Sequence, residues 1–232
     1  MNQDKCWDYY QNEGIDAFDQ SYPRLRYLVK LLHTVLRPAP ATRLRILNVG
    51  VGNGVFEELC VKAGHDVWSL DPSERNVHQL EQKLNVHAIV GTVEDAALPS
   101  DSFSVITMSE VLEHLPDSGL ERAVRNVRRM LNSSGVLIGT VPHQERLQDN
   151  MVVCPHCGER FHRWGHHQSF TPQRLNEVLA SQFPTVKIWI RPFIAWDKLN
   201  WKGRLLGALQ HLLAVARIHG RNESIVFYAK KA

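Results

Sequence analysis

The chain has 232 residues, of which 44% are hydrophobic and 22% are charged, as in globular proteins that bury a core without disulfides. Its formal net charge is only +3, which gives no support for nucleic acid as the main partner. The N-terminus is too polar for a signal peptide, and no apolar run reaches the roughly 18 residues that suggest a transmembrane helix. The four cysteines do not form a secreted disulfide framework, so we expect a cytoplasmic protein.

The first part of the chain alternates helical and extended patterns. Residues 21–36 carry leucines at helical spacing before two prolines, so residues 1–40 are expected to form an N-terminal helical cap. Strands are predicted at 44–51, 65–71, 86–91, 103–111 and 136–142, with helices at 54–64, 73–85 and 118–135 between them. This alternation predicts an α/β domain in which a parallel sheet has helices on both faces.

The last third of the chain completes the predicted domain. A helix is expected at 171–183, and strands are expected at 185–193 and 223–231. Two segments read as insertions into this pattern, one at about 143–170 and one at about 196–220. We therefore expect a single domain over residues 1–232 with two inserted segments.

A glycine-rich turn joins the first predicted strand to the next helix. Gly50, Gly52 and Gly54 allow the backbone to turn sharply and approach a ligand, which the free N–H groups of the helix would face. Asp71 ends the second strand, where a carboxylate can accept both hydroxyls of a ribose. A dinucleotide site prefers a glycine where Val55 stands, so an NAD-dependent oxidoreductase is only the alternative hypothesis.

Residues 44–143 resemble class I S-adenosylmethionine-dependent methyltransferases of the type 11 small-molecule branch, which includes ubiquinone-biosynthesis O-methyltransferases. The resemblance lies in "ILNVGVGNGVFEELCVKAGHDVWSLDPS", "GTVEDAALPSDSFSVITMSEVLEHLPD" and "VRRMLNSSGVLIGTVPH". It implies a Rossmann-like fold with a seven-stranded sheet of order 3-2-1-4-5-7-6, strand 7 antiparallel. It also implies methyl transfer from S-adenosylmethionine, chiefly to oxygen, on a small-molecule, saccharide or lipid-linked acceptor.

The same resemblance assigns roles to individual residues. It implies that the cofactor-binding residues are Gly50, Gly52, Gly54, Asp71, Pro72, Thr92, Val93, Glu94, Ser109 and Glu110. The glycines would line the methionine end, Asp71 the ribose, residues 92–94 the adenine, and residues 109–110 the sulfonium. Asn48 departs from the family, because it replaces the usual Asp and removes a negative charge near the cofactor ammonium.

Two histidines are candidates for the catalytic base. His114 and His143 each follow a predicted strand on the side of the sheet where ligands bind. Histidine titrates near neutral pH, so either one could take a proton from an acceptor hydroxyl. The alternative is that Glu113 and His114 form an ordinary exposed turn.

The stretch "CPHCGERFHRWGHH" at residues 154–167 has the ligand types of a zinc site. Cys154, Cys157, His162 and His166 would close a tetrahedral, structural site, with His167 as the alternative fourth ligand. A similar insertion in some type 11 methyltransferases favours His166. A redox cysteine pair or a loop without metal remains an alternative, and a zinc-knuckle module that binds nucleic acid is a third function hypothesis.

The insertion at 196–220 carries an apolar helical stripe flanked by basic residues. The stripe consists of Leu205, Leu209, Leu212, Leu213 and Ala216. It could pack over the edge of the sheet, or residues 202–219 could contact a membrane or a lipid-linked substrate. A lid or a dimer contact is also open, and the sequence does not indicate the oligomeric state.

Overall fold

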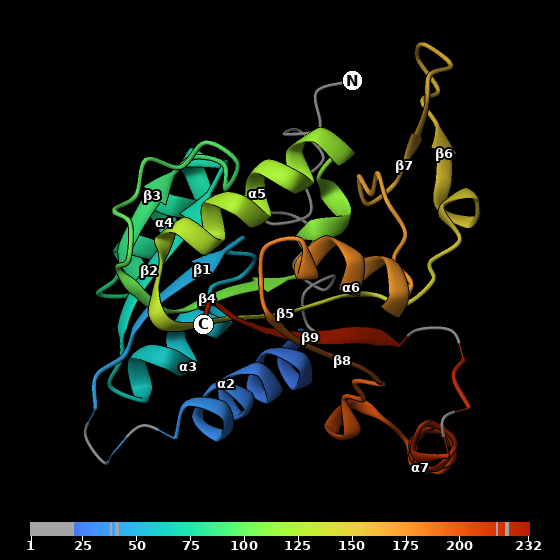
Figure 1. The fold of residues 1–232 in the computed structure, drawn as a ribbon. Helices are drawn as coiled ribbons and strands as arrows, with labels where there is room; N and C mark the ends of the chain where they lie inside the picture. The colour runs from blue at the N-terminus through green and yellow to red at the C-terminus, as the bar shows by residue number, and fades with distance from the viewer. Residues whose placement is uncertain (1–20, 38, 40–41, 217, 221–222) are drawn as a thin grey trace.

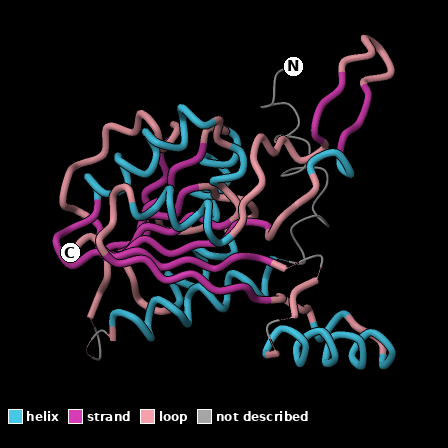
Figure 2. The backbone as a smooth tube through the Cα atoms, turned by 45° about the vertical axis from the view of Figure 1, so that its right-hand side comes forward, coloured by secondary structure: helices cyan, strands magenta, loops and turns pink. Residues whose placement is uncertain are grey.

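The computed structural model describes residues 21–37, 39, 42–216, 218–220 and 223–232. Figures 1 and 2 show one large sheet between helices, with a two-stranded hairpin and a helix, α7, extending from the body of the molecule. Most of the predicted N-terminal cap, residues 1–20, lies outside the described residues. In the described part of the chain, no helix has the length and apolar character needed to cross a membrane.

The large sheet has seven strands in the order β3-β2-β1-β4-β5-β9-β8. Strands β1 to β5 are parallel, and β9 runs antiparallel to both of its neighbours. The seven strands are β1 (Arg45–Val49), β2 (Asp66–Asp71), β3 (His87–Val90), β4 (Phe103–Ser109), β5 (Leu131–Pro142), β8 (Thr185–Arg191) and β9 (Ser224–Lys230). Without the hairpin strands, this is the arrangement 3-2-1-4-5-7-6.

The hairpin raises the number of strands in the described residues from the expected seven to nine. It consists of β6 (Met151–Val153) and β7 (Arg160–His162), which pair with each other in a separate sheet. It follows β5 in the chain and projects away from the large sheet (Figure 1). The predicted insertion therefore leaves the parallel sheet undisturbed.

Helices cover both faces of the sheet, so its inner strands are buried on both sides. Helices α5 (Asp117–Met130) and α6 (Pro172–Ala180) lie on one face, and α2 (Tyr22–Leu36) and α3 (Val55–Lys62) lie on the other (Figure 1). Helix α4 (Glu74–Lys83) lies beside β2 and β3. Adjacent residues of β1 show the alternation: Leu47 packs in the core on the α5 side, and Ile46 packs in the core on the α2 side. Burial on both faces explains the continuous apolar strand patterns.

The predicted junction between the helix at 118–135 and the strand at 136–142 is wrong. The helix expected over 118–135 ends at Met130, and Leu131 already belongs to β5. Leu131 is extended and pairs with Phe103 at the start of β4. The polar residues 132–134 do not continue the helix, because their short side chains compete for backbone hydrogen bonds.

The apolar stripe of the second insertion is exposed. A short helix, η5 (Trp196–Lys198), leads into α7 (Trp201–Val215), whose Gly207 packs against Ile194 and Trp196. The leucines of the stripe are largely exposed to solvent: Leu205 is 66% exposed, and Leu209 is 52% exposed. The expectation that this stripe packs over the sheet edge is therefore wrong, because α7 uses its glycine and not its leucines for contact.

Candidate active site

The turn between β1 and α3 has a backbone conformation and close neighbours that leave no room for side chains at its glycines. Gly50, Gly52 and Gly54 have φ values of 83°, 55° and 75°, in the left-handed region that favours glycine. A Cβ atom on Gly50 would lie 3.0 Å from Val111, and one on Gly54 would lie 2.9 Å from Leu80. The turn therefore presents bare backbone, with Gly54 as the N-cap of α3.

Asp71 fastens this turn to the end of β2. One carboxylate oxygen accepts the backbone N–H of Val51 at 2.8 Å, and the other accepts that of Ser73 at 2.9 Å. The residue is only 2% exposed, and burial raises the pKa of its carboxyl above the usual range. Because each carboxylate oxygen has a second lone pair, Asp71 can still accept a hydrogen bond from a ligand hydroxyl.

The residues expected near the adenine differ in their accessibility. Pro72 and Thr92 are exposed, and Glu94 is half-buried. Val93 packs in the core, and its carbonyl accepts a hydrogen bond from Asn126 at 2.8 Å. The side chain of Val93 is thus part of the hydrophobic core, and any contact it makes with a ligand would involve its backbone.

Ser109 and Glu110 end β4 beside a cation that the sequence pattern did not indicate. Arg24, near the start of α2, donates a hydrogen bond of 3.1 Å to Ser109 Oγ and lies 3.9 Å from the carboxylate of Glu110. Ser109 also shares a hydrogen bond with Thr140 on β5. Helix α2 therefore places a positive charge at the carboxyl end of the sheet, and only the folded chain reveals this contact over 85 residues.

A second residue missed in the sequence is the buried acid beneath the glycine turn. Glu57, in the first turn of α3, accepts hydrogen bonds from Asn48 at 2.7 Å and from Ser69 at 3.0 Å. Asn48 also donates to the carbonyl of Gly50 at 3.0 Å. Burial raises the pKa of Glu57 to about 7, although the hydrogen bond from Asn48 acts in the opposite direction.

Glu113 and His114 do not form an exposed turn. They lie in a short helix, η3 (Leu112–His114), where Glu113 is 1% exposed. Burial, and then the charge of Glu110, raises the pKa of Glu113 well above its usual range. Burial, followed by the neighbouring His166, lowers the pKa of His114 to about 3. His114 is therefore neutral at physiological pH and a weak proton acceptor.

His143 follows β5 in a different environment from His114. Its backbone N–H donates to the carbonyl of Glu223, and its ring lies edge-on to that of His219, with centroids 5.9 Å apart. Burial lowers the pKa of His143, while the carboxylate of Glu223 acts to raise it. The ring is half-buried and neutral near pH 7, as a proton acceptor requires.

The structure does not bring the four predicted zinc ligands together. Cys154 and Cys157 lie in the turn at the tip of the hairpin, whereas His162 pairs with Met151 at its base. Cys154 lies three residues along the chain from Met151, a distance of roughly 10 Å in a strand. The cysteines are therefore about that far from the level of His162 in the hairpin. His166 instead hydrogen-bonds Glu145, and among the described residues neither cysteine belongs to a group of three metal-type ligands. The described structure therefore gives no support to the predicted Cys₂His₂ set, which stays a prediction.

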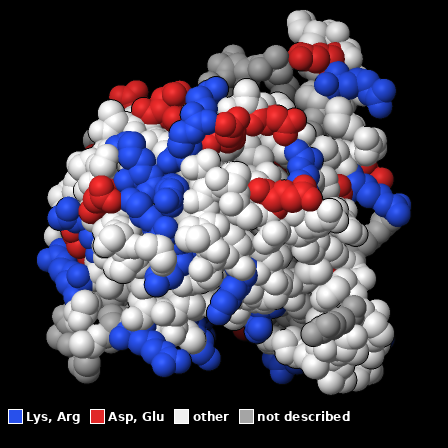
Figure 3. Space-filling view, in the orientation of Figure 1, with Lys and Arg blue, Asp and Glu red and all other residues white. Residues whose placement is uncertain are grey.

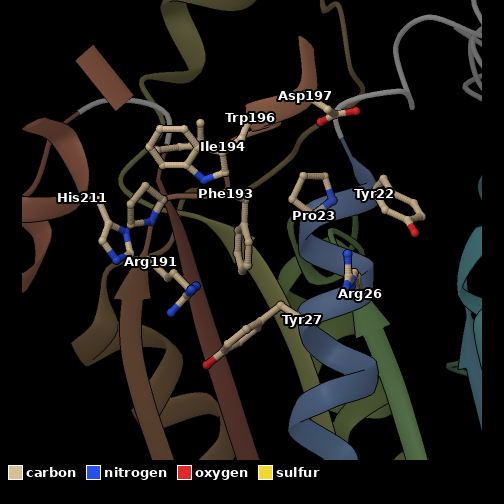
Figure 4. A pocket seen from close by; sticks show the side chains of 11 residues that line it. Tyr22, Pro23, Arg26, Tyr27, Arg191, Phe193, Ile194, Trp196, Asp197 and His211 are labelled. Carbon is tan, nitrogen blue, oxygen red and sulfur yellow. The ribbon is translucent and has the colours of Figure 1, made fainter. Parts of the chain in front are cut away.

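A cavity of about 690 Å³ lies at the far edge of the sheet. Figure 4 shows aromatic side chains of α2 and of the segment after β8 on its walls, with Arg191 between them. Arg191 lies over the ring of Tyr27, 4.4 Å from its centroid. Strand β8 is four positions from β1, roughly 19 Å at the usual strand spacing. Because Tyr22, Pro23 and Arg26 of α2 also line the cavity, it lies beside Arg24, which contacts Ser109, and it adjoins α7 through His211.

Comparison with known proteins places the chain among methyltransferases. A family model described as a methyltransferase domain matches residues 20–182. A ubiquinone biosynthesis O-methyltransferase of Azorhizobium caulinodans is 34% identical over 104 residues, which are 43% of this chain and 40% of that relative. The chain spans between 34% and 61% of the lengths of the curated relatives that it matches.

Two solved structures share the fold at low sequence identity. A possible histamine N-methyltransferase from Thermotoga maritima gives a TM-score of 0.65 at 20% identity, covering 98% of this chain and 99% of that one. A 1,6-didemethyltoxoflavin-N1-methyltransferase from Burkholderia thailandensis, solved with S-adenosylhomocysteine, gives 0.67 at 17% identity, covering 96% and 84%. At these identities the likeness extends to the fold alone.

Proposed function

Because the chain belongs to the methyltransferase domain family, we propose that it transfers a methyl group from S-adenosylmethionine to a small-molecule acceptor. The glycine turn fastened to Asp71 carries this proposal. It offers backbone that a side chain would block and a carboxylate suited to ribose hydroxyls. The cofactor supplies an already activated methyl group, so the main task of the protein is to align it with the acceptor.

The proposed cofactor contacts follow the elements of the carboxyl edge. Gly50, Gly52 and Gly54 would face the methionine part, and Asp71 would hold the ribose. Pro72 and the backbone of residues 92–94 would contact the adenine. Ser109 and Glu110, positioned by Arg24, would lie at the methionine and sulfonium end. Glu57 supports this assignment, because it places an acidic side chain beneath the turn, where it accepts a hydrogen bond from Asn48.

We propose oxygen as the atom that is methylated, on a small-molecule or saccharide acceptor. The support is the name of the curated relatives, which are O-methyltransferases. An acceptor hydroxyl must lose its proton, and His143 suits this role better than His114. His143 is half-buried and burial lowers its pKa, whereas the pKa of His114 falls to about 3.

The two alternative functions have less support. A nicotinamide-dependent oxidoreductase would prefer a glycine in place of Val55, the first residue of α3. A zinc-knuckle module would need the cysteines and histidines of the hairpin to meet, which they do not. The face shown in Figure 3 carries acidic and basic side chains together, without the continuous basic stripe of a nucleic-acid site.

We also propose that α7 contacts an anionic membrane surface. Trp201, Leu205 and Leu212 are each at least 66% exposed, and this end of the molecule is largely free of charge in Figure 3. The segment from residue 198 to 222 contains five Lys or Arg residues and no Asp or Glu. Basic flanks around an exposed apolar face with tryptophan are typical of helices that lie in the membrane interface.

One experiment separates these functions. Calorimetric titration of the protein with S-adenosylmethionine, NADH and an oligonucleotide should show binding of the first ligand alone. Labelled S-adenosylmethionine should then transfer its methyl group to hydroxylated compounds in an acceptor library. Binding of NADH without S-adenosylmethionine would refute the proposed function, and transfer only to amines would refute the choice of oxygen.

A further inference from the structure

Side chains of the kinds that can ligate a metal lie together beside the carboxyl end of β4. One carboxylate oxygen of Glu113 and one ring nitrogen each of His114 and His166 lie within 4.8 Å of one another. Glu145, His162 and His166 form a second group with the same spacing. These residues come from η3, from the segment after β5, and from β7 and the segment after it. His166 belongs to both groups, so it is the centre of the cluster.

Two of the histidines have one ring nitrogen hydrogen-bonded to a carbonyl or carboxylate oxygen, as is usual for metal-bound histidines. Nδ1 of His114 lies 3.2 Å from the carbonyl oxygen of Gly165, and Nδ1 of His166 is hydrogen-bonded to Glu145. Metal-bound histidines almost always donate their other ring N–H to such a carbonyl or carboxylate. Because Nδ1 is engaged in both rings, Nε2 is the atom that a metal would take. The two rings meet edge to face, with centroids 4.6 Å apart.

Glu113 supplies an independent observation that points to a cation ligand. The residue is 1% exposed, and neither carboxylate oxygen has a hydrogen-bond partner in the described part of the chain. A buried carboxylate without a partner is costly. The charges of Glu110 and Glu145 add repulsion at this site, and the charge of Arg24 opposes it. A divalent cation bound to Glu113 would offset both the burial and the repulsion.

We propose that Glu113, His114 and His166 bind a divalent transition-metal ion, with Glu145 and the carbonyl of Gly165 orienting the two imidazoles. Two imidazoles and one carboxylate suit the class of zinc, iron(II) and cobalt(II), whereas calcium and magnesium prefer oxygen ligands alone. Three protein ligands leave a coordination position open for water or another oxygen ligand.

His162 supports this site without being one of its ligands. Its ring stacks on that of His166 with centroids 4.7 Å apart, and its Nδ1 accepts the backbone N–H of His166 at 3.1 Å. In the neutral ring the proton is therefore on Nε2, which lies 3.4 Å from Glu145. The proposed ligand set uses no cysteine, which distinguishes it from a site at the hairpin tip.

The test is titration of the chelator-treated whole chain with cobalt(II), followed by absorption spectroscopy and metal analysis. We expect about one cobalt per chain, with visible bands of a nitrogen and oxygen site and no thiolate-to-cobalt band. Glu113→Gln and His166→Ala should each weaken cobalt binding at least tenfold. Glu145→Gln should weaken it by about 10–100-fold, as expected of a residue that orients a ligand.

The matched control is the double variant Cys154→Ser, Cys157→Ser, which should keep the affinity of the unaltered protein. Loss of cobalt in this variant, or a thiolate band in the unaltered protein, would place the metal on the cysteines and overturn the proposal. Failure of the unaltered protein to bind cobalt stoichiometrically would also overturn it. The spectrum of the unaltered protein decides the matter even if a variant does not fold. Because metal binding is read directly, this result does not depend on methyl transfer.

Discussion

Asn48 Nδ2 lies 2.7 Å from Oε1 of Glu57, and this hydrogen bond joins the end of β1 to the first turn of α3. Glu57 is fully buried, and its second carboxylate oxygen has no hydrogen-bond partner in the described part of the chain. Asn48 stands where the resemblance to methyltransferases implies Asp, and it donates to an acid nine residues later. The acidic side chain thus lies on the helix beneath the glycine turn and not on the strand.

This buried acid should make stability depend on pH. The pKa of Glu57 rises from 4.5 to about 7 on folding, so the folded state holds its proton more tightly than the unfolded state. Its contribution to stability is therefore lost as pH rises from 4.5 to about 7, a loss on the order of 3 kcal/mol. Glu57→Gln cannot ionise, so the loss should disappear. Denaturant unfolding at about pH 4.5 and pH 8 measures it.

The neighbouring Glu58 provides the matched control. It is about one-third exposed and pairs with Lys62, which lowers its pKa. Glu58→Gln should keep the decline in stability between pH 4.5 and 7 that Glu57 causes. If the Glu57→Gln protein showed the same decline as the unaltered protein, the raised pKa of Glu57 would be wrong.

The sequence predicted the parts of the fold that depend on local pattern. The buried strands were visible because residues such as Ile46 and Leu47 face two different cores and are both apolar. The position of Asp71 at the end of β2 was also predicted from this pattern, whereas its role stays a prediction. Glu57 escaped detection because an acid in the first turn of a helix is ordinary, and nothing in the sequence shows that it is buried.

The contacts that the sequence could not predict join distant segments. Arg24 meets Ser109 across 85 residues, and Glu145 meets His166 across 21. The spacing of Cys154, Cys157 and the histidines fits a zinc site, but strand pairing in the hairpin sets the cysteines apart. Spacing along the chain therefore does not show which of these residues meet in the folded protein.

Removing the carboxylate of Asp71 should weaken binding of S-adenosylmethionine. Asp71→Ala would lose the hydrogen bonds proposed for the ribose and the bond to Val51 that shapes the turn. Hydrogen bonds to charged groups contribute about 1.5–3 kcal/mol each, so the affinity should fall at least tenfold by calorimetry. Glu121→Ala, at an exposed acid on α5, is the control and should bind normally. Unchanged affinity of the Asp71 variant would rule out its proposed role.

A charge placed on α7 should reduce binding to anionic vesicles. Leu209 is 52% exposed on α7, and Leu209→Asp adds a negative charge to the proposed membrane face. Val90→Asp is the matched control, because Val90 is 50% exposed on β3, away from α7. Vesicle sedimentation should show at least a fivefold loss of binding for the first variant and none for the second. Equal binding by both variants would show that α7 is not the contact.

Replacing His143 should remove the acid limb of the pH–rate profile for methyl transfer. Burial keeps the pKa of His143 below its usual value of 6.5, while Glu223 opposes the shift, so the ring is neutral at pH 7 and can accept a proton. A positioned base typically contributes about 10²–10⁴-fold, so His143→Gln should lower kcat by that factor with little change in KM. His78→Gln, at an exposed histidine on α4, should leave the profile unchanged. A His143→Gln enzyme that kept both its rate and the acid limb would exclude His143 as the base and leave proton removal to another group.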